Sequence, residues 1–262
     1  MSATHLDKII EKKRERVEAL KIAVPIETIV QAARERVRPK KSFLEAISSA
    51  NKINIIAEFK RASPSKGTIN GTGRPDEMAQ MYEAGGAAAI SVLTEEDFFA
   101  GSIGDLKAVK SSVSIPVLRK DFIIDEYQIY EAAAAGADAI LLIVAALMPD
   151  ELEGLRSLTK EIGLDALVEV HDKNELDTAV SLKADIIGVN NRNLKTLDVS
   201  LDVSRRLIQS AREGPVMVAE SGIARREDIK ELRSLGYSAF LVGETLMSSE
   251  YPAKALRGLI DV

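Results

Sequence analysis

The chain has 262 residues, of which 46% are hydrophobic and 29% charged, and its formal net charge is −5. This composition excludes disorder over most of the chain, and the acidic balance provides no overall field that would attract nucleic acid or an anionic membrane. The absence of cysteine excludes disulfides, thiolate nucleophiles and zinc-cysteine sites, and the two histidines, His5 and His171, cannot form a multi-histidine metal site. Carboxylates, lysines and hydroxyls remain as the available chemistry.

Residues 1–50 are predicted to form a helical extension that packs on the domain that follows. One helical stripe carries the apolar side chains that would face this domain. Charged residues interrupt every turn of the first twenty positions, so the segment lacks the apolar core of a signal peptide, and we expect a cytoplasmic location. The stripe consists of Leu6, Ile9, Ile10, Val17 and Leu20.

A basic cluster, Lys12 to Arg14 together with Arg16, lies in this first helix. Glu11, Glu15 and Glu18 are interleaved with it and neutralise its charge. We therefore interpret the cluster as a solvated helix face rather than a binding surface.

Residues 51–262 contain eight short runs rich in β-branched residues, each followed by an amphipathic helical stretch. The continuous apolar character of these runs is typical of parallel strands that are buried on both faces. Eight consecutive β–α units favour a closed (β/α)8 TIM barrel, an α/β fold, over an open doubly wound sheet, which usually has fewer strands. We expect one domain overall. The predicted strands are 53–60, 87–94, 116–122, 139–144, 166–170, 185–190, 216–221 and 239–244.

Charged or polar residues stand near the C-terminal ends of five predicted strands, where active sites of this fold form. A strand has a two-residue period, which places Glu58 and Lys60 on one face. Burying such groups together is costly unless they pair with one another and with a ligand, so their convergence predicts a functional site. They are Glu58, Lys60, Lys120, Glu169, Asn190 and Glu220.

Lysines surrounded by glutamates, without a cluster of metal ligands, are suited to proton transfer around a carbonyl or imine. A lysine held among carboxylates stays charged and donates a proton, whereas a desolvated lysine becomes a Schiff-base nucleophile. The sequence leaves both alternatives open.

A phosphate site is predicted from the segments after the last two strands. Ser221-Gly222 and Gly243 stand where backbone N–H groups can approach an anion at the start of a helix, the usual phosphate site of this fold. The loop 61–67 adds hydroxyls and a base that could close over a ligand.

At these positions the chain resembles the indole-3-glycerol-phosphate synthase family of tryptophan biosynthesis. The resemblance covers nearly the whole chain after the N-terminal helices, and it is carried by IIAEFKRASPSKG, PVLRKDFIIDEYQI, LVEVHD, IIGVNNRNLKTLDV, VAESGI and FLVGETLM. Its most specific motif is E-x-K-x-x-S-P-S-x-G. The length fits the monofunctional form of the family.

The resemblance implies conversion of 1-(2-carboxyphenylamino)-1-deoxyribulose 5-phosphate into indole-3-glycerol phosphate, with loss of carbon dioxide and water and without cofactor or metal. It further implies that Lys120 is the general acid and that Lys60 pairs with the substrate carboxylate. Glu58 and Glu169 would transfer protons in ring closure and dehydration, and which of the two serves each step stays open. Asn190 and Glu220 would position hydroxyls and the lysines.

The remaining implied contacts are those of the substrate's two ends. The phosphate would lie on Ser63, Ser221, Gly222 and Gly243, and Arg192 matches a family position just after the sixth strand. The anthranilate ring would be enclosed by Phe99, Phe122 and Leu141.

Two other functions stay open at this stage. One is a Schiff-base aldolase or isomerase that acts on a sugar phosphate, with Lys120 as its nucleophile. The other is a non-catalytic phosphosugar-binding barrel. No nucleic-acid or membrane partner is expected, and a monomer and a homodimer are equally compatible with the sequence.

Overall fold

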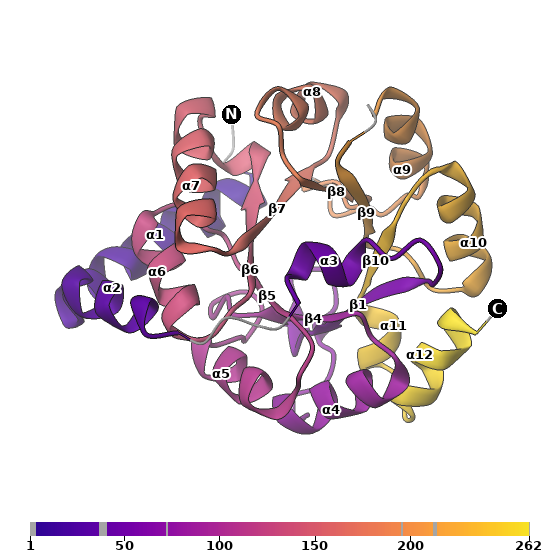
Figure 1. The fold of residues 1–262 in the computed structure, drawn as a ribbon, viewed down its shortest axis with the longest axis horizontal. Helices are drawn as coiled ribbons and strands as arrows, with labels where there is room; N and C mark the ends of the chain where they lie inside the picture. The colour runs from indigo at the N-terminus through magenta and orange to yellow at the C-terminus, as the bar shows by residue number, and fades with distance from the viewer. Residues whose placement is uncertain (1–3, 37–40, 72, 195, 212–213, 262) are drawn as a thin grey trace.

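The computed structural model describes residues 4–36, 41–71, 73–194, 196–211 and 214–261. Over these residues, eight parallel strands close into a barrel in the order β1-β10-β9-β8-β7-β6-β5-β4, as Figure 1 shows. The predicted TIM barrel and all eight of its predicted strands are confirmed. The strands are β1 (Asn54–Phe59), β4 (Ala89–Leu93), β5 (Val117–Lys120), β6 (Ala139–Ile143), β7 (Asp165–Val170), β8 (Ile186–Asn190), β9 (Val216–Glu220) and β10 (Ala239–Val242).

Helices surround the barrel and connect its strands, as the alternating pattern predicts (Figure 1). Their ends follow the local signals: Pro149 occupies the first turn of α7, and Gly163 ends it in a left-handed conformation with φ 79°. The helices after β1 are α4 (Pro75–Gly85), α5 (Ile103–Ser112), α6 (Glu126–Ala134), α7 (Pro149–Ile162), α8 (Lys173–Ser181), α9 (Asp202–Leu207), α10 (Arg226–Leu235), α11 (Glu244–Met247) and α12 (Pro252–Ile260). Two 3-10 turns, η1 (Val144–Ala146) and η2 (Ile208–Ser210), follow β6 and α9.

The two faces of the barrel wall bury different sets of side chains. Ile55 and Ile90 pack outward among the helices, whereas Ile56 and Leu118 pack inside the barrel. This alternation follows from the two-residue period of a strand, and it fills both the interior and the layer under the helices. The same alternation directs a charged residue at a strand's C-terminal end either into the barrel mouth or away from it.

Among the described residues, three helices precede the first strand: α1 (His5–Ala23), α2 (Ile26–Arg34) and α3 (Phe43–Ile47). Helix α2 lies beside α6 (Figure 1), and α3 inserts Phe43 and Ile47, both fully buried, among the interior side chains of the barrel. In the part of the chain that the structure describes, no helix combines the length and the apolar character needed to cross a membrane.

The interpretation of the basic cluster on α1 as a solvated face was wrong for one of its members, Lys13. Lys13 is 4% exposed, and its Nζ lies 2.8 Å from Asp121 Oδ1 and 3.2 Å from Glu96 Oε2. The side chain of Arg16 stays 38% exposed, and its Nε lies 2.5 Å from Asp97 Oδ2. The neighbours in sequence predicted solvation, but the carboxylates that bind these cations lie on the loops after β4 and β5.

Replacing Lys13 by Met should lower the free energy of unfolding by about 3 kcal/mol, because breaking a buried ion pair leaves an uncompensated charge. This loss is at the lower end of the range for buried ion pairs, because Asp121 keeps its second partner, Arg119. The Nη2 of Arg119 lies 3.1 Å from Asp121 Oδ2. Urea unfolding measures the change. Lys12→Met removes only an exposed pair with Glu15 and serves as the control; equal stability of the two variants would contradict a structural role for Lys13.

Candidate active site

The C-terminal ends of the barrel strands surround a cavity of about 580 Å³. Thirteen of the fourteen predicted site residues line it, and Ser63 does not. The lining residues from the prediction are Glu58, Lys60, Phe99, Lys120, Phe122, Leu141, Glu169, Asn190, Arg192, Glu220, Ser221, Gly222 and Gly243.

Lys120, at the end of β5, lies at the centre of the charged groups. Its Nζ is 2.9 Å from Glu169 Oε2 and 3.3 Å from Glu220 Oε2. Burial opposes the charge of this ammonium, but Glu169, Glu220 and Glu58 outweigh burial and raise the pKa of Lys120 above its usual value. Lys120 is therefore a charged proton donor.

The two carboxyls beside Lys120 differ in protonation. Burial would raise the pKa of Glu169, but Lys120 and His171 outweigh burial and hold it well below its usual range. Burial raises the pKa of Glu220 to about 8, because the charge of Glu169 adds to the effect and Lys120 offsets it only partly. At neutral pH Glu169 is a carboxylate, and Glu220 holds a proton.

A second lysine–glutamate pair faces the same cavity from β1. Lys60 Nζ lies 2.6 Å from Glu58 Oε1, so the two side chains share one face as their spacing predicts. Glu58 is packed closely against the backbone directly after β10: a Cβ on Gly243 would lie 2.4 Å from Glu58 Oε1. Gly243 is thus required for space beside Glu58, in addition to its predicted place at the phosphate site.

The segment after β9 has an unusual backbone. Ser221 adopts φ 65° and Gly222 φ 78°, two consecutive residues in the left-handed region. A side chain at Gly222 would also meet Val199 Cγ1 at 2.6 Å. A serine held in this conformation is typical of a functional site, where surrounding structure maintains the strain.

The loop after β1 forms a small antiparallel hairpin of β2 (Ala62–Ser63) and β3 (Gly67–Thr68). The turn between them directs Ser65 and Lys66 to the cavity, and Lys66 Nζ lies 3.2 Å from Glu244 Oε1 at the start of α11. Ser63 is buried behind them, with its Oγ 3.4 Å from Ser65 Oγ.

Arg192 connects the hairpin with the end of β8. Its backbone N–H donates to Asn190 Oδ1 at 2.9 Å, and its Nη1 donates to Ser65 Oγ at 3.2 Å. Nη1 also donates to the carbonyl of Leu197 at 2.9 Å, which fixes the guanidinium at the cavity rim.

The opposite side of the cavity is apolar. The rings of Phe99 and Phe122 lie with centroids 6.3 Å apart and planes inclined by 39°. Leu141 from β6 faces the same space, together with Leu93 and Ile143. A planar aromatic ring of a ligand fits this side, and an anionic group fits the side of Ser221 and Gly243.

Sequence reasoning missed two residues that shape the charged cluster. Gly188 on β8 gives space to Glu220: a Cβ there would lie 2.0 Å from Glu220 Oε1. His171 lies 3.3 Å from Glu169 through its Nε2. Its position two residues after Glu169, on the same face by strand period, was the available signal.

The carboxylates of Glu95, Glu96 and Asp97 lie close enough together to consider a metal site. Glu95 accepts from the backbone N–H groups of 97, 98 and 99, whereas Lys13 and Arg16 pair with the other two. The carboxylates of this cluster already have partners, and we assign no metal to it.

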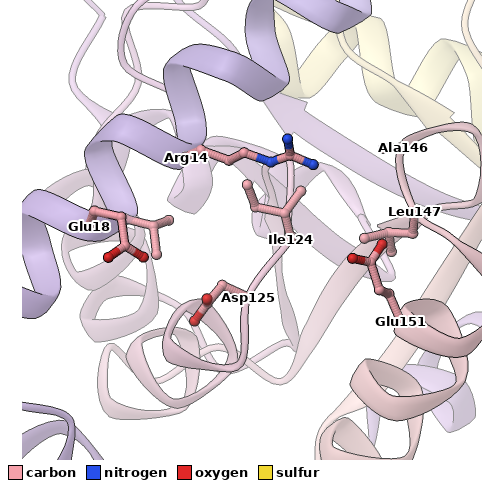
Figure 2. Close-up of a pocket in the computed structure, with 8 residues that line it drawn as sticks. Arg14, Glu18, Ile124, Asp125, Ala146, Leu147 and Glu151 are labelled. Carbon is pink, nitrogen blue, oxygen red and sulfur yellow. The ribbon is translucent and has the colours of Figure 1, made fainter.

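A smaller hollow of about 280 Å³ lies outside the barrel mouth, between α1 and the loops after β5 and β6. Figure 2 shows Arg14 reaching from α1 over Ile124, with the carboxylates of Glu18, Asp125 and Glu151 around it. None of the predicted site residues lines this hollow, so we place the chemistry in the barrel mouth.

Comparison with known proteins gives one consistent result. The family model described as indole-3-glycerol phosphate synthase matches residues 6–259. Proteins of that name from Carboxydothermus hydrogenoformans and Desulfosudis oleivorans are 47% and 45% identical over 261 and 257 residues, which cover 97% of this chain and 99% and 98% of theirs. The one from Chloroherpeton thalassium is 47% identical over 94% of this chain and 96% of its own.

Among solved structures, thiamine phosphate pyrophosphorylase from Pyrococcus furiosus superposes with a TM-score of 0.58 at 18% identity. The match covers 79% of this chain and 93% of that chain. At this identity the likeness concerns the fold alone.

Gly188→Ala should lower kcat about 100-fold, because its Cβ forces the Glu220 carboxyl away from Lys120 and small displacements in an active site cost about this much. Steady-state kinetics measure the loss. Gly154→Ala on α7 is the matched control, since its Cβ meets nothing within 4 Å and should leave kcat unchanged. Wild-type kcat in the Gly188 variant would show that the position of Glu220 does not matter.

Proposed function

The chain belongs to the indole-3-glycerol phosphate synthase family, and from this premise we propose how its cavity carries out the reaction. The enzyme is a carboxy-lyase of tryptophan biosynthesis that acts on a phosphorylated small molecule. It converts 1-(2-carboxyphenylamino)-1-deoxyribulose 5-phosphate into indole-3-glycerol phosphate by ring closure, decarboxylation and dehydration. The residue roles below are our proposal.

The observation that carries the proposal is the ammonium of Lys120, buried at the barrel mouth between Glu169 and Glu220. A Schiff-base nucleophile needs a neutral amine, and the surrounding carboxylates oppose its formation. A charged lysine is instead ready to protonate an oxygen on which negative charge develops. The geometry favours general acid catalysis over an imine mechanism.

Ring closure is the first step. The aryl carbon that bears the carboxylate attacks the ketone carbon of the ribulose chain, the carbonyl π electrons move to oxygen, and Lys120 protonates that oxygen. Lys60 pairs with the substrate carboxylate during the attack. The bond to the carboxyl carbon then breaks, carbon dioxide leaves, and its electron pair returns to the ring and restores aromaticity.

Dehydration completes the indole. The new hydroxyl leaves as water after taking a second proton, and the adjacent methylene carbon loses a proton to a carboxylate, for which we propose Glu169 or Glu58. Two protons enter and one leaves, so the cycle takes up one proton from solvent, as the conversion of a carboxylate to carbon dioxide requires. Asn190 and Glu220 position the substrate hydroxyls and the lysines.

The two ends of the substrate occupy the two sides of the cavity. We propose that the phosphate lies on the backbone of Ser221, Gly222 and Gly243, with Ser65 and Lys66 covering it and Ser63 supporting Ser65. Binding energy from this remote group holds the flexible chain in a reactive bend.

At the opposite end, the anthranilate ring lies between Phe99, Phe122 and Leu141, the apolar side of the same cavity. Arg192 at the rim positions the polar atoms of the chain. Excluding water from this side strengthens the electrostatic contacts of the lysines.

We also propose that residues 1–50 and 51–262 form one domain and that the enzyme works in the cytoplasm without a nucleic-acid or membrane partner. The ion pair of Lys13 with Asp121, which joins α1 to the end of β5, supports the single domain.

Turnover is tested by adding the carboxyphenylamino-deoxyribulose phosphate to purified, chelator-treated protein and following indole fluorescence. We expect product to appear without added metal or cofactor. If no product forms, the assigned reaction is wrong for this chain, and phosphosugar binding without turnover would then identify a non-catalytic barrel.

Lys120→Met should lower kcat about 1,000-fold, because loss of a general acid typically costs two to four orders of magnitude. Inorganic phosphate binding should be retained, since the phosphate site lies on other strands. Lys173→Met, at an exposed pair with Asp177, is the control and should keep full activity. Reduction by borohydride during turnover distinguishes the alternative: covalent trapping of substrate on wild-type Lys120 would establish the imine mechanism.

A further inference from the structure

His171 lies beside the proposed catalytic groups but has no part in the steps above. It follows β7 directly, two residues after Glu169, and its side chain is 13% exposed. Its Nε2 lies 3.3 Å from Glu169 Oε1, while Lys120 Nζ lies 2.9 Å from the other oxygen, Glu169 Oε2. The Glu169 carboxylate is therefore held between two nitrogen groups.

The start of α8 fixes the orientation of the imidazole. Glu175 Oε2 accepts from the backbone N–H of His171 at 2.8 Å and lies 3.0 Å from its Nδ1. Asp172, the N-cap of α8, accepts from the N–H of Glu175 at 3.0 Å and so holds that residue in place. With Nδ1 bound to Glu175, Nε2 must face Glu169.

This arrangement determines the charge of the ring. A neutral imidazole carries one N–H, so either tautomer would direct a lone pair at one of the two carboxylates. The imidazolium carries an N–H on both nitrogens, so Nδ1 donates to Glu175 and Nε2 presents positive charge to Glu169 at 3.3 Å. Burial opposes that charge, but Glu169 and Glu175 outweigh burial and raise the pKa of His171 to about 10. The neighbouring turn η1 consists of Val144, Ala145 and Ala146 and adds no charge.

We infer that His171 is a positioning residue of the reaction: as an imidazolium fixed by Glu175, it keeps Glu169 ionised and turns its second oxygen toward Lys120. This inference rests on the proposed function, because Glu169 is there the partner of the general acid and a candidate base. The cation at Nε2 lets Glu169 remain a carboxylate even when Lys120 has given its proton to the substrate.

The charge of His171 is tested first, independently of turnover. The chain has only two histidines, so His5→Asn leaves His171 as the single imidazole, and ¹⁵N NMR of the labelled protein reports its protonation directly. We expect both ring nitrogens to be protonated at pH 8. A neutral ring at pH 8 would overturn the inference, whether or not the proposed reaction occurs.

The effect on Glu169 is tested by kinetics. His171→Asn replaces the cation by a neutral group, so the pKa of Glu169 should rise and the acid limb of the kcat/KM profile should move up by about one pH unit. At a fixed pH on that limb, kcat/KM should fall about tenfold, whereas above the limb the two proteins should agree. Identical acid limbs in the variant and the wild type would refute the positioning role.

Two matched variants separate this effect from a purely structural one. Ser42→Ala removes the N-cap of another helix, α3, and should lower stability without moving the pH profile. Glu175→Gln removes one of the two carboxylates that hold the proton, so His171 should lose its proton at a lower pH in the NMR titration. An unchanged titration in Glu175→Gln would contradict the proposed origin of the charge.

The pH dependence of the free energy of unfolding gives a further test, because the charge of His171 fixes the direction of the change. A group whose pKa rises on folding stabilises the native state below its unfolded pKa, and this contribution disappears as pH rises through the folded pKa. The stability difference between wild type and His171→Asn should thus be largest below pH 6.5 and decline toward pH 10. A difference independent of pH would indicate a structural contact alone.

Discussion

The site depends on one electrostatic constraint: an ammonium buried among the carboxyl groups of three glutamates at the mouth of the barrel. Glu58, Glu169 and Glu220 come from β1, β7 and β9, and only closure of the barrel brings them to Lys120. Without that cation the buried carboxylates would repel one another, and desolvation would neutralise them. Lys120, which allows the strand ends to converge, is thus also the proposed proton donor. Stability and catalysis therefore both require a lysine at the end of β5.

Within this cluster, small differences in contact give two chemically similar carboxyls different protonation. Glu169 has a cation at each oxygen and stays ionised, whereas Glu220 shares Lys120 at 3.3 Å and keeps a proton near neutrality. A carboxylate that accepts and a carboxylic acid that donates can therefore act on the same substrate. Gly188 matters for this reason, since the absence of a side chain there leaves the space that the Glu220 carboxyl occupies beside Lys120.

The sequence was sufficient for the barrel and for the charged residues at its strand ends because both follow from periodicity, whereas the apolar wall of the cavity was implied only by the family resemblance. Continuous apolar runs predict strands buried on both faces, and a charged residue at the end of such a run must face either the mouth or the helices. Contacts between segments that are distant in the sequence leave no periodic pattern from which they could be predicted. The hairpin after β1 pairs Ser63 with Gly67 and so removes Ser63 from the cavity in favour of Ser65. In the same way, α1 by itself gives no indication that Lys13 is bound to Asp121.

The ion pair of Lys13 with Asp121 shows how helix α1 is connected to the site. Asp121 follows Lys120 directly, so adjacent residues of one backbone segment are held by different partners: Lys120 by the carboxylates of the mouth, and Asp121 by Lys13 and Arg119. On the neighbouring loop, Glu96 binds Lys13, while Glu95 accepts from the backbone N–H of Phe99, which forms part of the apolar wall. Because α1 thus contacts both the segment that carries the general acid and the loop that carries the ring contact, a shift of α1 would disturb both sides of the cavity together.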